Sequence, residues 1–181
     1  MDDLISRIFF KPYRVNYPID VILQDVPNSV IETAYKYKLI QQRIGIAWGE
    51  VPTIYGWRIG DNGIDLVNET TKQAAEVKNN SRTDNSRSRR ANFDNLLQFK
   101  TLNPEYELLY IIINDKTDKD VMKYNGRIRY VSGIHAQRIL FGEDSQNVIN
   151  KLKQYTIQFL NRSDLINTEC DSNQNHFIMK I

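Results

Sequence analysis

Apolar and polar residues alternate along two neighbouring stretches of the chain, residues 64–67 and 74–78. A period of two is typical of β-strands that are buried on one face. We predict an antiparallel hairpin in which Asn68 pairs with Gln73 and the four residues 69–72 form the loop. Extending that register pairs Asp65 with Glu76. One face then carries the charged residues, and the other carries the apolar set Ile64, Leu66, Ala75 and Val77.

Apolar residues at three- and four-residue spacing predict amphipathic helices elsewhere in the chain. The predicted helices cover residues 2–10, 30–44, 93–102, 132–142 and 145–162. Asn92 is expected to cap the helix 93–102. Residues 46–59 contain glycines and a proline, which favours a loop that leads into a strand near 53–59.

The most apolar run, residues 106–114, predicts a central strand that is buried on both faces. Residues 121–131 contain Asn-Gly between strand-like flanks, which predicts a second hairpin. These elements together predict an α/β fold with a mixed central sheet flanked by helices. We expect one domain over residues 1–181, with a core at about 30–115, a hairpin and helices at 116–162 and a tail at 163–181. The tail is either poorly ordered or adds an edge strand through its last residues, FIMKI.

Composition narrows the class of protein. The chain has 181 residues, of which 41% are hydrophobic and 25% charged, as in ordinary globular proteins. No apolar run approaches the roughly 20 residues that span a bilayer, and the N-terminus is unlike a signal peptide. One cysteine and two distant histidines argue against disulfides and against zinc sites. We therefore expect a cytoplasmic protein without a membrane partner.

The facing acids in the predicted hairpin suggest a chemistry. Asp65 and Glu76 would repel each other unless a cation lay between them. Carboxylate oxygens suit Mg²⁺, which completes its shell with water and substrate phosphate. Lys78 lies on the same face and would orient an attacking water or hold a phosphate oxygen. The same pattern also fits an exposed hairpin face that carries only a Glu–Lys ion pair.

A basic segment follows Lys78 directly. Residues 79–90, NNSRTDNSRSRR, contain four arginines and one acid. Arginine binds phosphate through paired hydrogen bonds and also binds guanine in the major groove. We expect this segment to grip DNA through Asn79, Asn80, Arg82, Arg87, Arg89 and Arg90. A solvated basic loop is the alternative.

A second basic set, Lys123, Arg127, Arg129 and Arg138, either clamps the other side of a duplex or lies on a solvated face. His135 is a candidate general base, although a histidine in a short helix is more often structural.

The order of a hairpin with Asp65, then Glu76-Val77-Lys78, then a helix and a buried strand resembles the core of the PD-(D/E)xK nuclease superfamily. Ile64 stands where many members have proline. Three stretches of the chain are also similar to Type II restriction endonucleases, in particular the group that cuts GGNCC-like sites. They are IGIAWGE (44–50), residues 76–96 and YELLYIIINDK (106–116). The resemblance implies a further acid near the first helix, either Glu50, which lies in one of these stretches, or Glu32.

The resemblance implies an Mg²⁺-dependent endonuclease that cuts double-stranded DNA at a specific sequence. Asp65, Glu76 and Glu50 would be metal ligands, and Lys78 would position the water. A palindromic target implies a homodimer. The alternatives are a structure-selective or repair nuclease similar to a junction resolvase, and a DNA-binding module without catalysis.

Overall fold

The computed structural model describes residues 2–10, 13–16, 44–79, 86–161, 167–171 and 176–180. The chain forms two compact units, one made of Met1–Ala47 with Leu152–Ile181 and the other of Trp48–Lys151. The assignment of residues 1–181 to a single nuclease domain stays a prediction. Among the described residues, no helix has the length and apolar character that crossing a membrane requires.

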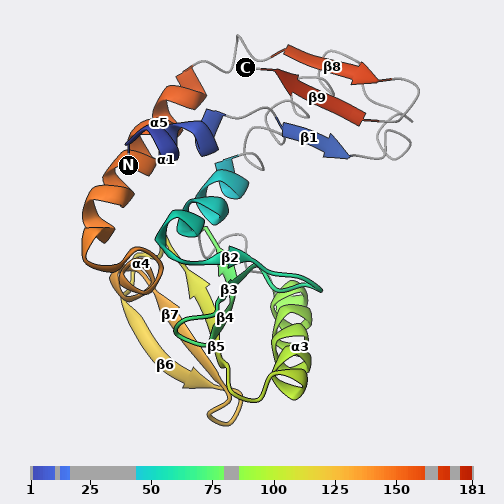
Figure 1. The fold of residues 1–181 in the computed structure, drawn as a ribbon, viewed down its shortest axis with the longest axis vertical. Coiled ribbons are helices and arrows are strands. Elements are labelled where there is room, and N and C mark those ends of the chain that lie inside the picture. Colours follow the sequence, from blue (N-terminus) through green and yellow to red (C-terminus); the bar gives the residue numbers. More distant parts are fainter. Residues whose placement is uncertain are drawn as a thin grey trace. The chain divides into compact units, whose positions relative to one another are not determined.

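The unit Trp48–Lys151 contains a six-stranded mixed sheet (Figure 1). In spatial order its strands are β2 (Arg58–Ile59), β3 (Leu66–Asn68), β4 (Gln73–Lys78), β5 (Glu107–Ile112), β7 (Ile128–Ser132) and β6 (Lys119–Lys123). The pairs β4–β5 and β5–β7 are parallel, and the other pairs are antiparallel. The predicted α/β class with a mixed central sheet is confirmed.

Strand β5 forms the centre of this sheet, as predicted. Its residues from Leu108 to Ile112, together with Ile113, are at most 2% exposed. A strand whose two faces are both covered needs apolar residues at every position, which explains the uninterrupted run. The hairpin predicted at 121–131 is also present, as β6 and β7, with left-handed backbone at Asn125 and Gly126 in its turn.

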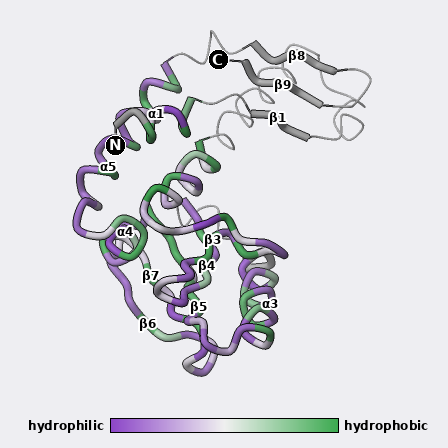
Figure 2. The backbone as a smooth tube through the Cα atoms, in the orientation of Figure 1, coloured by the Kyte–Doolittle hydropathy of each residue, from purple (hydrophilic) through white to green (hydrophobic). Residues whose placement is uncertain are grey.

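Helix α3 (Ser86–Leu102) covers one face of the sheet. Phe93 and Leu96 pack there in a core cluster with Val67, Ala74 and Tyr110. In Figure 2, α3 alternates between hydrophilic and hydrophobic residues along its length, as expected for a helix with one buried side. On the other side of the sheet lies α4 (Ile134–Phe141), which packs against β7.

The start of α3 was predicted wrongly. The helix begins at Ser86 and not at residue 93, so Asn92 lies inside it and is not its cap. The polar composition of residues 86–92 suggested a loop, but arginine and alanine favour a helix, and no proline or glycine interrupts them.

Residues 46–59 also differ from the prediction. Residues 44–50 are helical, and a 3-10 helix, η2 (Val51–Tyr55), follows directly. Only Arg58 and Ile59 form a strand. Gly49 disfavours a helix by about 1 kcal/mol, but burial of Ala47, Trp48 and Val51 outweighs that cost.

The unit formed by the two ends of the chain has a sheet of its own, with strand order β1 (Tyr13–Asn16), β9 (His176–Lys180), β8 (Asn167–Asp171). The described part of the FIMKI segment, residues 177–180, therefore forms a strand, but in the middle of a second sheet. In the same unit, Phe9 of α1 (Asp2–Phe10) packs against Tyr155 and Phe159 of α5 (Ser145–Asn161). The helix predicted at 30–44 lies outside the described residues except at Ile44.

Candidate active site

The hairpin that carries the predicted acids has the predicted register. Leu66 pairs with Ala75, Val67 with Ala74 and Asn68 with Gln73. The amide oxygen of Asn68 accepts hydrogen bonds from the backbone N–H groups of Thr70 and Thr71, at 3.1 and 3.0 Å. This side chain closes the four-residue loop and sets the register from within the hairpin itself.

The ladder changes at Asp65. Its backbone N–H donates to the Ala75 carbonyl at 3.1 Å, and its carboxylate Oδ2 accepts from the Val77 N–H at 2.8 Å. Asp65 is thereby held beside β4 by its side chain and lies outside the regular pairing. One consequence corrects the prediction: Ile64 packs in the core cluster with Val67 and Ala74, and not on the opposite face with Leu66.

Glu76 and Lys78 lie on the face of β4 that α3 covers. In the parallel ladder, Glu76 is in register with Tyr110 and Lys78 with Ile112, and both partners belong to the α3-side core cluster. Glu76 is only 4% exposed. The Lys78 ammonium forms an ion pair with Oε1 of Glu76. The structure thus brings Asp65, Glu76 and Lys78 together at one end of the sheet.

The electrostatics of this cluster are unfavourable for a charged Glu76. Burial and the nearby Asp65 charge raise the pKa of Glu76 to about 7, against the opposing effect of Lys78. A buried carboxylate beside a second carboxylate is the arrangement that a divalent cation stabilises. The donor set of two carboxylates, one buried and one exposed to solvent, fits Mg²⁺, which binds one or two carboxylates and retains several waters.

Glu50, the predicted accessory acid, is half-buried at the end of the helical residues 44–50. Its backbone carbonyl accepts a hydrogen bond from the Thr53 hydroxyl at 2.8 Å. Within the described part of the chain, no three acidic, histidine or cysteine side chains are grouped closely enough to hold a metal ion. Glu50 therefore does not complete a three-ligand group with Asp65 and Glu76 there. Glu32 lies outside the described residues.

The predicted DNA-binding residues are placed in part. Asn79 continues β4, where its carbonyl and amide oxygens accept hydrogen bonds from the backbone and side chain of Asn114, at 2.8 and 2.6 Å. Arg87, Arg89 and Arg90 belong to the first turns of α3. Arg90 is exposed and Arg89 half-buried, whereas the Arg87 side chain, Asn80 and Arg82 lie outside what the structure describes.

In the second basic set, Arg129 has a structural role. Its guanidinium donates to Asp120 at 2.8 and 2.7 Å and to Glu107 at 3.3 Å, which ties β7 to both of its neighbours. The hydrogen bonds from Arg129 to Asp120 lower the pKa of Asp120, and the nearby His135 on α4 adds a smaller electrostatic effect in the same direction. The other three cations, Lys123 and Arg127 at the β6–β7 turn and Arg138 on α4, are exposed.

Two features were missed from the sequence. Asn114 follows the buried strand, and its pairing with Asn79 depends on the parallel contact of β4 with β5. A cavity lined by carboxamides lies between the β2–β3 segment and α3. The three-residue spacing of Asn95 and Gln98, which places both on one side of a helix, was a signal for one wall. No pattern showed that this wall meets Asn62, because the two segments are far apart in sequence.

The sequence matches a known protein family. The model of a family described as Eco47II restriction endonuclease matches residues 34–145, which is more than half of the 181 residues. The matched range includes Asp65, Glu76 and Lys78 and nearly all of the unit Trp48–Lys151. No curated protein and no solved structure matches the chain.

Proposed function

The chain belongs to the Eco47II restriction endonuclease family, and on this premise we propose that it is an Mg²⁺-dependent Type II enzyme of the PD-(D/E)xK superfamily. Its substrate would be double-stranded DNA, cut at a specific sequence. The proposal rests on one observation: Asp65, the buried Glu76 and Lys78 lie close together at one end of the sheet.

Asp65 and Glu76 would hold the metal ion. The bond from the Val77 N–H fixes the Asp65 carboxylate, and burial limits the movement of Glu76, so both oxygen donors are positioned before the ion binds. When bound, Mg²⁺ would polarise the scissile phosphate and lower the pKa of a coordinated water. Glu50 is the proposed accessory ligand, through a water or after a local movement.

Lys78 would position the attacking water and stabilise charge on the phosphate. The water oxygen would attack phosphorus in line, and the bond from phosphorus to the 3′ oxygen would break with its electron pair on that oxygen. The proton lost by the water would pass to solvent, and the 3′ oxygen would take a proton from solvent. In the structure the ammonium neutralises Glu76. Once that carboxylate is a metal ligand, the ammonium is available to water and phosphate.

The DNA would lie along the beginning of α3. Arg90 is exposed there and suits a phosphate contact. Arg82, Arg87, Arg89 and the two asparagines Asn79 and Asn80 are the other proposed contacts. A palindromic target would require a two-fold homodimer with one site in each subunit, which the molar mass measured in solution tests.

The experiment is a digest of mixed-sequence plasmid with Mg²⁺, followed by sequencing of the ends. Discrete bands support a restriction enzyme, whereas structure-dependent nicking favours a resolvase or repair nuclease. DNA binding without cutting favours a binding module. Asp65→Asn and Glu76→Gln should each abolish cutting with the thermal melt preserved. Glu105→Gln is the matched control, because Glu105 is an exposed turn residue. Cutting retained by either site variant contradicts the assignment.

A further inference from the structure

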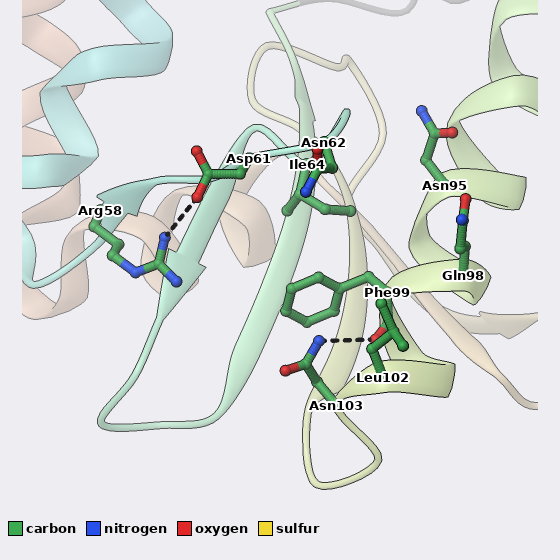
Figure 3. Close-up of a pocket in the computed structure, with 9 residues that line it drawn as sticks. All are labelled: Arg58, Asp61, Asn62, Ile64, Asn95, Gln98, Phe99, Leu102 and Asn103. Carbon is green, nitrogen blue, oxygen red and sulfur yellow. Dashed lines mark hydrogen bonds and ion pairs between the residues drawn. The ribbon is translucent and has the colours of Figure 1, made fainter.

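A cavity of about 510 Å³ lies between α3 and the segment that joins β2 to β3 (Figure 3). Four carboxamide side chains line it: Asn62, Asn95, Gln98 and Asn103. Carboxamides offer both hydrogen-bond donors and acceptors, and therefore suit a ligand whose edge carries both. Asn103 already donates to the Phe99 carbonyl at 3.0 Å, which leaves its amide oxygen as an acceptor.

The charges around the cavity favour a neutral ligand. Of the described residues that line it, Arg58 alone is cationic. Its Nε and Nη2 donate to Glu69 at 3.0 and 2.7 Å, and its Nη1 donates to the Ile59 carbonyl at 3.2 Å. Asp61 adds a negative charge at the rim, 3.9 Å from the guanidinium. A phosphate would meet no uncommitted positive charge among these residues.

The rest of the lining is apolar. Figure 3 shows the Phe99 ring extending from α3 toward the strands, and Ile64 and Leu102 line the same cavity. The Phe99 ring packs edge-on against the Tyr106 ring, with 5.3 Å between the ring centroids. The Tyr106 hydroxyl donates a hydrogen bond to Glu69, which also accepts hydrogen bonds from Arg58. The wall is therefore fixed by a chain of contacts. Leu102, which is 77% exposed, extends the apolar surface at the rim.

The cavity also lies close to the cluster of acids. Its lining residue Ile64 directly precedes Asp65, about 3.8 Å away along the backbone. On α3, Gln98 lies two turns beyond Arg90 on the exposed stripe, a rise of roughly 12 Å. Base pairs are spaced by about 3.4 Å, so this distance corresponds to about three or four steps of a duplex.

We infer that this cavity receives a nucleobase of the DNA substrate, with the carboxamides on its hydrogen-bonding edge and the apolar wall of Phe99 and Leu102 against its face. Nucleobases combine a polar edge of donors and acceptors with an apolar face, and Asn and Gln side chains pair with such edges. The inference rests on the proposed nuclease function and deepens it, because it places one specificity-determining contact.

The test uses a plasmid library with randomised sequence and the full-length protein. Gln98→Ala removes an exposed carboxamide, and Asn62→Gly removes another while keeping a left-handed backbone, since Asn62 has φ +53°. Each should slow cleavage of the mapped site by about tenfold to a hundredfold and relax the preference at one base position. Asp94→Ala, an exposed change on the same helix outside the cavity, should keep the wild-type base preference.

The salt dependence of DNA binding distinguishes a contact with a base from a contact with a phosphate. The slope of binding affinity against salt should be the same for Gln98→Ala and the wild type, because a base contact releases no counterion. Unchanged base preference in both variants, or a slope reduced by about one, would overturn the inference. If the wild type makes no discrete cuts, the proposed nuclease function is wrong. This outcome is distinguishable from a wild type that cuts at a site whose base preference the two variants leave unchanged.

Discussion

The Asp65 carboxylate accepts a hydrogen bond from the Val77 N–H, with 2.8 Å between Oδ2 and the nitrogen. Val77 lies between Glu76 and Lys78 in β4, so this bond fixes the first acid next to the other two charged groups. The carboxylates are held together in spite of their repulsion, which explains why Asp65 acts on the pKa of Glu76.

Asp65→Asn should lower the pKa of Glu76 from about 7, because the Asp65 charge is, after burial, one of the causes that raise it. The asparagine amide oxygen can still accept the Val77 hydrogen bond, so the geometry is preserved. An NMR titration of the glutamate carboxyl carbons measures the shift. An unchanged Glu76 pKa in this variant would show that the two carboxylates do not interact in solution.

Stability without a metal ion should fall as pH rises from the ordinary glutamate pKa of 4.5 to about 7. The folded state binds the Glu76 proton more tightly than the unfolded state, so its contribution is greatest at low pH and declines through this window, by at most about 1.4 kcal/mol per pH unit. Denaturant unfolding in EDTA measures it. Glu76→Gln should flatten the profile, and a profile as steep as that of the wild type would contradict this account.

Gly63→Ala should destabilise the protein by about 1–3 kcal/mol. Gly63 has φ +82°, and a Cβ there would overlap the amide nitrogen of Asn95 on α3. Gly126→Ala is the control, since Gly126 has φ +77° but open space around it and so adds only backbone strain. Thermal and denaturant unfolding compare the two. A larger loss for Gly63→Ala would show that Asn95 cannot turn aside, equal losses would show that it can, and no loss for Gly63→Ala would contradict the predicted strain.

Arg90→Ala should weaken DNA binding similarly for all sequences and reduce the salt slope by about one. Arg90 is exposed on the first turns of α3, where a phosphate contact is proposed. Lys153→Ala removes an exposed charge from α5 and serves as the control. Fluorescence anisotropy at several salt concentrations gives the slopes. Equal salt slopes for Arg90→Ala and the wild type would contradict a phosphate contact at Arg90.

The hairpin was predictable because its determinants are local. Residues 64–78 contain the alternation, the loop and the capping Asn68, and the observed pairs of Leu66, Val67 and Asn68 follow from them. The position of Ile64 could not be derived in this way. It depends on the Asp65 side chain replacing a regular backbone contact, which an alternating pattern does not reveal.

The remaining differences come from tertiary packing. Helix formation at 46–50 ran against glycine content, and burial of Trp48 stabilises that helix. At 86–92 the helix propensity of arginine and alanine is favourable, and burial of Phe93 in the next turn adds to it. The cavity is lined by residues 61–64 on one side and residues 95–103 on the other, and these segments are far apart in sequence. Periodicity within either segment does not show that they meet.

Strand β9 lies between β1 and β8, so residues from opposite ends of the chain, such as Tyr13 and Met179, pair directly. Contacts of such long sequence separation form slowly, because nearly the whole chain must be closed into a loop before they are made. Removing β9 would leave β1 and β8 without their common neighbour. Deleting β9 therefore acts on all three strands of this sheet, although β1 lies at the other end of the sequence.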